Sequence, residues 1–285
     1  MDWNLIIENS LKGLVGINAV YFAVAAIGMN VQYGYTGLLN FGQAGFMACG
    51  AYGLGMTAHY FDIPMWWGIP IGILFSVVLG LLMGIPTLRL RADYLAIVTI
   101  ASAEIIRLVV RSVKFKTYFG GSDGINNFSE TFREIGTNLG IKQSAEYGFW
   151  PFRFTGRELW TLIIGWVFVA FFGFLVYQLM KSPWGRVLKA IREDEDAVRS
   201  LGKNVYSYKM QSLILGGVIG TFSGMIFALD RGSVQPDNYS RDVTFYVLTA
   251  LVLGGVAKVT GSIIGPMLFW GLFTFVDNFL RQVAE

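Results

Sequence analysis

The sequence is poor in the residues that build disulfide and metal sites. It contains one cysteine, Cys49, and one histidine, His59, in 285 residues. A single cysteine excludes an intrachain disulfide and a thiolate metal cluster, and a single histidine excludes a multi-histidine metal site. No nucleophile, base and orienting acid are placed together along the chain. We therefore expect no catalytic, cofactor-binding or metal-binding residues here.

Charge and nucleotide-binding motifs are also scarce. Charged residues make up 14% of the chain and the net charge is +3, which is too small and too unevenly spread to indicate nucleic-acid binding. The GxxxxGK[ST] phosphate-binding loop is absent, since Gly202-Lys203-Asn204 lacks both the upstream glycine and the hydroxyl residue. The sequence therefore contains no phosphate-binding loop of this type.

Apolar residues dominate instead. They make up 54% of the chain, and several runs exceed the roughly 20 residues that a helix needs to cross a bilayer. Asp2 and Glu8 occur without a basic region, so we expect no cleaved signal peptide. The pattern predicts an all-α polytopic membrane protein with one transmembrane domain over residues 1–285. About eight spans are expected, at 11–33, 38–59, 65–88, 94–110, 159–180, 210–229, 243–257 and 259–280.

Two of these spans have unusual features. Glycines crowd the span at 38–59, and the span at 243–257 is too short to cross as a straight helix. Both are candidates for broken or re-entrant elements, which occur at membrane depth only where protein or a water-filled cavity satisfies the freed backbone groups.

Basic residues predict the orientation. They mark three short connections: Arg89 and Arg91, the segment 182–209, and Lys258. These connections should be cytoplasmic, and the connector at 112–157 should be extracytoplasmic. Lys114 and Lys116 run against this pattern, but the rule is weaker in a long loop.

The segment 182–209 is a polar island in an apolar chain. Ser182 and Pro183 are typical of a helix start, and Gly202 of a helix end. The spacing predicts one amphipathic helix with an apolar stripe and a charged face. It could lie at the interface or bind a soluble partner, and the acidic run at 193–196 favours a protein partner over anionic lipid. The stripe comprises Val187, Leu188, Ile191, Val198 and Leu201, and the charged face comprises Lys189, Arg192, Glu193, Asp196 and Arg199.

The island resembles the cytoplasmic loop of the branched-chain amino acid ABC-importer permeases, specifically their larger, M-type subunit. The matching residues are Ser182, Trp184, Gly185, Arg186, Ala190, Ile191, Arg192, Glu193, Leu201 and Gly202. Four further segments are similar to family motifs in the same order: 35–53 (YTGLLNFGQAGFMACGAYG), 88–104 (LRLRADYLAIVTIASAE), 120–125 (GGSDGI) and 251–266 (LVLGGVAKVTGSIIGP).

The resemblance implies a permease in the bacterial plasma (inner) membrane that forms half of an import pathway. It implies a second homologous permease in a heterodimer, two cytoplasmic ATPases that hold ATP and Mg, an extracytoplasmic binding protein, and surrounding lipid. The substrate would be a branched-chain or other neutral amino acid; related permeases carry urea or short amides. The helix at 190–201 would couple to an ATPase through Arg186, Ala190, Arg192, Glu193 and Glu195, with Leu201 packing inward and Gly202 ending it.

Paired glycine interruptions, one in each half of the chain, point to a translocation site. The candidates are Asn40, Gly42, Gln43 and Gly45 in the first half, and Gly254 and Gly255 in the second. Freed backbone groups and the two amide side chains could meet an amino acid zwitterion there. Gly80 and Gly84, and Gly220 and Gly224, have the spacing of close helix packing instead.

Two charged residues lie within the span at 94–110. Glu104 and Arg107 are three residues apart and can pair on one helical face. The alternative is that they contact substrate, or couple ions in a self-contained secondary transporter or channel.

Overall fold

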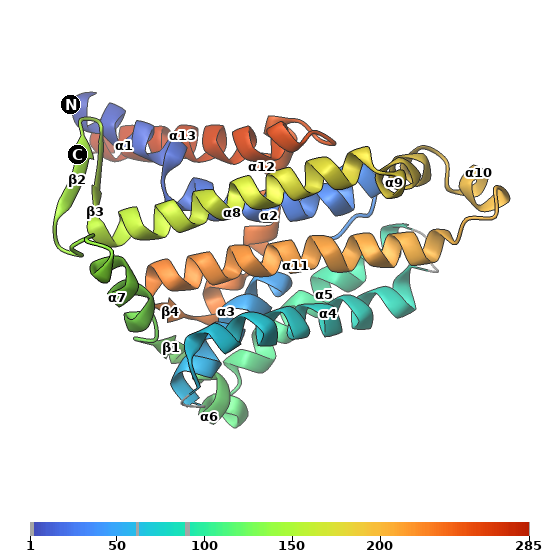
Figure 1. Cartoon of the computed structure of the whole chain (residues 1–285), viewed down its shortest axis with the longest axis horizontal. Coiled ribbons are helices and arrows are strands. Elements are labelled where there is room, and N and C mark those ends of the chain that lie inside the picture. Colours follow the sequence, from blue (N-terminus) through green and yellow to red (C-terminus); the bar gives the residue numbers. More distant parts are fainter. Residues whose placement is uncertain (1–2, 61–62, 89–91, 285) are drawn as a thin grey trace.

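Long helices form a bundle, and short helices and strands connect them (Figure 1). A computed structural model describes residues 3–60, 63–88 and 92–284. The long helices are α1 (Trp3–Val15), α2 (Ile17–Met29), α3 (Gln43–Tyr60), α4 (Gly68–Thr87), α5 (Ala92–Arg111), α8 (Gly156–Lys181), α11 (Val205–Arg231), α12 (Arg241–Gly254) and α13 (Val259–Ala284). The short elements are η1 (Asn30–Tyr35, a π-helix), η2 (Met65–Trp67), η3 (Val113–Phe115), α6 (Lys116–Phe119), η4 (Gly121–Asp123), β1 (Ile125–Asn126), α7 (Glu130–Asn138), β2 (Glu146–Phe149), β3 (Phe152–Thr155), α9 (Pro183–Glu193), α10 (Glu195–Ser200), β4 (Ser233–Val234) and η5 (Pro236–Tyr239).

Five helical segments of the described chain are long and apolar enough to cross a membrane. They coincide with five of the eight predicted spans. The first begins earlier than predicted and is interrupted at Gly16, whose extended backbone separates α1 from α2. The five segments are Trp3–Tyr35, Met65–Thr87, Gly156–Lys181, Val205–Arg231 and Val259–Val283.

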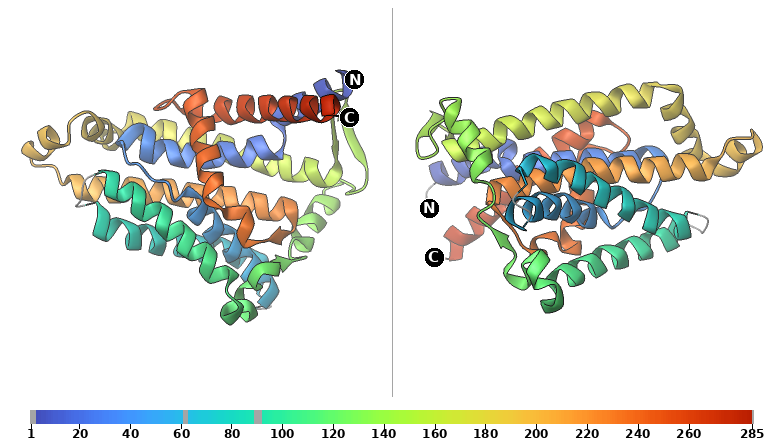
Figure 2. Two further views of the ribbon diagram at one scale, coloured as in Figure 1. Left: turned by 180° about the vertical axis from the view of Figure 1, so that it is seen from behind. Right: turned by 60° about the horizontal axis from the view of Figure 1, so that its bottom comes forward.

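The other three predicted spans, at 38–59, 94–110 and 243–257, correspond to α3, α5 and α12, which are not among these five segments. α3 begins only at Gln43, after a non-helical segment at 37–42. α12 has 14 residues, about 21 Å of helix, which is shorter than a hydrocarbon core of about 30 Å. Figure 2 shows α12 running obliquely across the long helices. The total of about eight spans, with broken or re-entrant elements at 38–59 and 243–257, therefore stays a prediction.

Close packing around α11 forms the core of the bundle. Helices α2, α3 and α4 all lie against α11. Glycine permits this approach, because a Cβ atom at Gly224 would come within 1.9 Å of the Met47 carbonyl oxygen. Gly84 similarly faces Met210, where a Cβ would lie 2.7 Å from the sulfur. The predicted role of these glycine pairs in helix packing is confirmed.

The connector at 112–157 lies at the end of the bundle that also carries both chain termini (Figure 1). It contains strands that the all-α prediction lacked. β1 pairs with β4 in antiparallel fashion, and β2 forms a hairpin with β3. Lys116 binds Asp123 at 2.8 Å, and this hydrogen bond lowers the pKa of the Asp123 carboxyl below its ordinary value.

The polar island lies toward the opposite end of the bundle, where α9 and α10 project (Figures 1 and 2). Lys258 is joined to this end through Asn30 of η1, whose side-chain amide donates to the Lys258 carbonyl at 3.0 Å. Arg89 and Arg91 lie outside the described residues. The positions of the described basic connections therefore agree with the predicted alternation.

Candidate functional site

The polar island forms two helices, not the single helix that was predicted. Ser182 caps α9 by accepting a hydrogen bond from the Gly185 amide, with Pro183 in the first turn. Asp194 has an extended backbone and caps α10 through the Ala197 amide at 3.0 Å. A carboxylate at that point satisfies an orphan donor of α10, so the chain begins a new helix there. Gly202, with φ of +75°, follows the end of α10 in the predicted left-handed conformation.

α9 packs against the bundle through its apolar face. Leu188 and Ile191 are 0% and 4% exposed. Gly185 allows the close approach, because a Cβ there would lie 2.5 Å from the Met180 Cα. Each buried aliphatic side chain contributes roughly 1.5–3 kcal/mol. The α9 part of the predicted apolar stripe is therefore correct.

The predicted inward packing of Leu201 is wrong. Its side chain is 79% exposed. The chain begins a new helix at Asp194, and α10 ends at Ser200, so that Leu201 follows the helix. Of the two stripe residues predicted beyond Asp194, Val198 is buried and Leu201 is not. Val198 is the buried residue of α10.

Arg192 joins α9 to η1, the π-helix that follows α2. Its Nη1 donates to the Gly34 carbonyl oxygen at 2.7 Å. A Cβ atom at Gly37, where φ is +74°, would lie 3.3 Å from the Arg192 Cγ. The Arg192 side chain is exposed, as predicted for the charged face, and it also bonds directly to η1.

The other predicted ATPase-coupling residues on α9 and α10 differ in how far their side chains are exposed. Arg186, Ala190 and Glu193 are exposed and recur at helical spacing on α9. Glu195 is half-buried, pairs with Arg199 at 2.8 Å, and also binds Lys209. A cavity of about 240 Å³ lies beside this cluster and is bordered by Arg192, Glu195 and Lys209.

A buried hydrogen-bond network holds η1 and the non-helical segment at 37–42 that follows it. Gln32 donates to the Leu213 carbonyl at 2.8 Å, and Asn40 donates to the Gln32 Oε1 at 2.7 Å. The hydroxyls of Thr36 and Ser212 lie 2.7 Å apart. Because buried polar groups are costly when unpaired, this network fixes the position of the non-helical backbone.

The start of α3 is capped by neighbouring elements. The Phe41 amide donates to Thr99 Oγ1 at 3.0 Å, and the Ala44 amide donates to Thr244 Oγ1 at 2.9 Å. Asn40 Oδ1 accepts from the Gly42 amide at 2.8 Å. These amides, which the sequence suggested as free groups for a zwitterion, have partners within the chain.

Gln43 is different from Asn40. Its side chain is 0% exposed, and its Nε2 makes two long hydrogen bonds of 3.4 Å to the Ala25 and Gly216 carbonyls. Its Oε1 is a buried acceptor without a donor in the part of the chain that the structure describes. Gly45 instead packs on α5, where a Cβ would lie 3.2 Å from Ala103.

The second interruption lies between α12 and α13. Gly255 has φ of +101°, and a Cβ atom at Gly254 would lie 1.9 Å from the Gly261 carbonyl oxygen. Asn30 holds the turn, because its Oδ1 accepts from the Ala257 amide at 2.9 Å and its Nδ2 bonds Lys258. The turn that follows Gly254 and Gly255 is therefore bonded to η1. Asn40 to Gly45 lie elsewhere, at the start of α3.

Asn30 and Gln32 were not among the predicted pathway residues. Both are polar side chains within an apolar span, and both are 0% exposed. An amide side chain in such a span needs a partner, and this was the available signal.

Arg107 is the centre of an ion-pair cluster on α5. It bonds Glu104 at 2.6 Å, which confirms the predicted pairing, and Asp237 of η5 at 2.7 Å, which was not predicted. Arg111 also binds Asp237, at 3.0 Å. The cluster ties α5 to η5 and uses both charged residues of the predicted pair.

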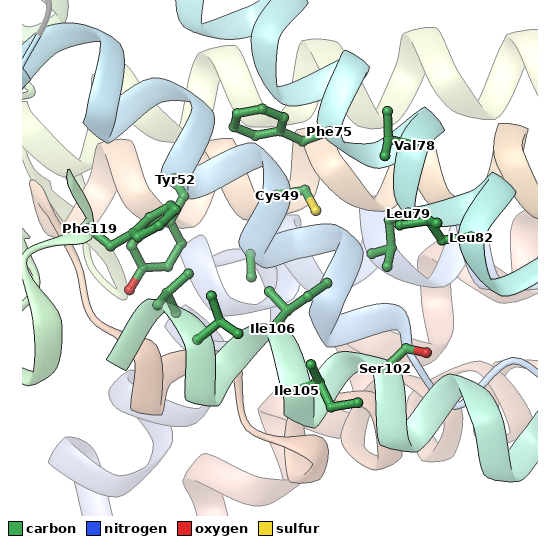
Figure 3. A pocket seen from close by; sticks show the side chains of 13 residues that line it. Cys49, Tyr52, Phe75, Val78, Leu79, Leu82, Ser102, Ile105, Ile106 and Phe119 are labelled. Carbon is green, nitrogen blue, oxygen red and sulfur yellow. The ribbon is translucent and has the colours of Figure 1, made fainter. Parts of the chain in front are cut away.

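An apolar pocket of about 400 Å³ lies between α3, α4 and α5 (Figure 3). Cys49 and Leu79 form part of its wall, and Tyr52 and Phe119 meet edge to face at one end with ring centroids 5.8 Å apart. The pocket-lining set contains none of the predicted pathway residues. Within residues 3–60, 63–88 and 92–284, no group of three or more His, Cys, Asp and Glu side chains could hold a metal ion.

Comparison with known proteins agrees with this architecture. Residues 14–285 match the family described as branched-chain amino acid transport system permease component. The chain is 31% identical, over 281 residues, to the high-affinity branched-chain amino acid transport system permease protein LivM of Escherichia coli, covering 93% of this chain and 63% of that protein. It is 25% identical to a probable LivM of Methanocaldococcus jannaschii, covering 87% of this chain and 76% of that protein.

A permease with a different named cargo is also similar. The nucleoside ABC transporter permease protein NupC of Lactococcus lactis is 25% identical over 254 residues, covering 84% of this chain and 73% of NupC. The chain spans less than two thirds of the length of the Escherichia coli LivM that it matches. The matches and the apolar helices identify a multi-pass membrane protein, which in a bacterium lies in the plasma (inner) membrane. The chain belongs to the branched-chain amino acid transport permease family.

Proposed function

We propose that this chain is a non-catalytic permease subunit of an ATP-driven importer for branched-chain or other neutral amino acids. The observation that carries the proposal is the placement of α9. One of its residues, Arg192, bonds to a broken membrane helix, while Arg186, Ala190 and Glu193 remain exposed on the same helix. Such a helix can receive a partner on one face and act on the membrane domain through the other.

The partner in this proposal is a cytoplasmic ATPase, which would hold ATP and Mg. Closure of two ATPases would displace α9 as a rigid body. The Arg192 hydrogen bond would pass this displacement to Gly34 and η1. Asn30 would extend it to the turn at 255–258, because its amide bonds both Ala257 and Lys258. In this proposal, η1 and the turn at 255–258 would then move together.

A second homologous permease would complete the pathway, and an extracytoplasmic binding protein would deliver the cargo. Within this chain, we assign Gln43 a greater part in the pathway than Asn40. The Gln43 acceptor is buried without a donor among the described residues, whereas both polar ends of the Asn40 side chain are bonded internally. A substrate ammonium or its water could use the Gln43 oxygen. Asn40 would hold the non-helical segment in shape.

The test is ATP-dependent uptake of labelled leucine in liposomes that contain this chain, its second permease, the ATPases and the binding protein. We expect Gln43→Ala to lower uptake about tenfold with normal ATPase association, and Gln43→Glu to alter cargo preference. Transport by this chain alone, without any ATPase, would contradict the importer proposal. Unchanged uptake by Gln43→Ala at normal expression would contradict only the assignment of Gln43.

A further inference from the structure

A polar cavity of about 440 Å³ lies at the end of the bundle opposite α9 and α10. It is enclosed by the α1–α2 junction, β3, α8, α11 and α13. Its lining includes five charged residues of both signs, together with three asparagines and a threonine. The charged residues are Lys12, Arg153, Glu158, Asp230 and Arg231.

Several of these charges lack an ionic partner. Lys12 pairs with Glu8 at 2.8 Å, and Glu158 accepts from the Thr155 amide at 3.0 Å. Neither the Asp230 carboxylate nor the Arg153 guanidinium forms an ion pair among the residues that the structure describes. Asp230 is half-buried, Arg157 donates to its backbone carbonyl, and the charges of Arg157, Arg231 and Arg133 act on its carboxylate without a salt bridge. A carboxylate removed from water is stabilised by nearby cations. The cavity therefore offers sites for a cation and an anion at once.

An apolar groove of about 510 Å³ adjoins this cavity. The two share Phe154, and their linings continue across consecutive residues, from Val15 to Gly16 and from Glu158 to Leu159. The groove follows α8, where Ile163 and Val167 are 43% and 59% exposed on a membrane-spanning helix. Its open side therefore faces hydrocarbon.

We propose that the cavity and the groove together bind one zwitterionic phospholipid of the outer leaflet. The ammonium of the headgroup lies by Asp230, and the phosphate lies by Arg153 and Arg231. One acyl chain follows the groove past Ile163 and Val167, with Phe154 at the junction. A free amino acid has the same two charges, but it would leave the groove empty, so the apolar surface favours the lipid.

Native mass spectrometry of the full chain tests this proposal, with phosphatidylethanolamine and phosphatidylglycerol added in equal amounts. Only the first carries an ammonium group. We expect phosphatidylethanolamine to be retained preferentially, and Asp230→Asn to reduce that preference roughly tenfold, as for the loss of one partly buried charge pair. Val167→Trp should reduce retention of both lipids by filling the groove.

The matched control is Val109→Trp, which fills the separate apolar pocket of Figure 3 and should leave the lipid ratio unchanged. Thermal unfolding verifies that each variant is folded, and Arg153→Gln, at an exposed position of β3, provides a second variant that should weaken both lipids through the phosphate. Equal retention of the two lipids by the unsubstituted chain would overturn the proposal. Displacement of the lipid by millimolar leucine would do so as well, by assigning the cavity to a free amino acid.

Discussion

The two short helices of the polar island are adjacent in sequence but have opposite relations to the membrane domain. α9 places Leu188 in the core and bonds Arg192 to a broken membrane helix. α10 leaves Leu201 exposed and is held mainly by Val198 and by the pairing of Glu195 with Lys209. In the proposed mechanism, α9 would transmit force and α10 would contribute an outer surface. Four sets of variants test this contrast.

The largest effect should come from core substitution in α9. Leu188→Ala removes a fully buried side chain and should destabilise the protein by about 2–5 kcal/mol. The same change at Leu201, which is 79% exposed, should stay within about 0.5 kcal/mol. Thermal unfolding in detergent measures both. Equal losses would show that α10 is as deeply integrated as α9.

Loss of the Arg192 hydrogen bond should come next. Arg192→Ala should cost about 1.5–3 kcal/mol of interaction with Gly34 and lower ATP-dependent uptake, while the ATPase still co-purifies. Arg186→Glu is the matched change on the exposed face and should reduce ATPase co-purification instead. The division between transmission and docking fails if both variants lose the ATPase equally.

Two glycines with almost the same backbone angle provide a third comparison. Gly37 and Gly202 have φ of +74° and +75°, so alanine is strained by about 1–2 kcal/mol at either position. At Gly37 the new Cβ would also press on Arg192 at 3.3 Å, whereas nothing lies within 4 Å at Gly202. We therefore expect Gly37→Ala to lower both stability and uptake more than Gly202→Ala. Similar values for the two variants would mean that Arg192 moves aside freely.

The smallest effect should appear at the surface of α10. Arg199 is 62% exposed at its side chain and pairs with Glu195 and Asp196 within one turn. Arg199→Ala should change stability by no more than about 0.5 kcal/mol, and salt should reduce the change further. A change above about 1 kcal/mol in unfolding experiments at 0.15 M salt would show that α10 needs this network to fold.

Local chemistry explains why parts of the site were predictable. Ser182 with Pro183, and Gly202, mark helix ends through their own backbone and side-chain preferences, and the structure has them in those roles. The helix break at Asp194 was not predictable in this way, because a capping aspartate cannot be distinguished in sequence from the other acidic residues of the run at 193–196. The assignment of Leu201 failed because α10 ends at Ser200, so that Leu201 follows the helix.

Other features depend on contacts between distant residues. Arg192 meets Gly34 across 158 residues and Asn30 meets Lys258 across 228, and no periodicity in sequence encodes such pairs. The same holds for the capping of α3 by Thr99 and Thr244. These threonines resemble any other small residue of an apolar helix until the packing brings them to an orphan amide.

The sequence was sufficient to predict a helical membrane protein, because long apolar segments placed in lipid must satisfy their backbone groups internally. It was also sufficient to indicate the family and to locate the polar island and the glycine interruptions. Which segments meet, which face of the island is buried, and where amides find acceptors became known from the packed helices. Those outcomes depend on how several helices pack at once, and one residue's preference cannot set the position of another hundreds of residues away.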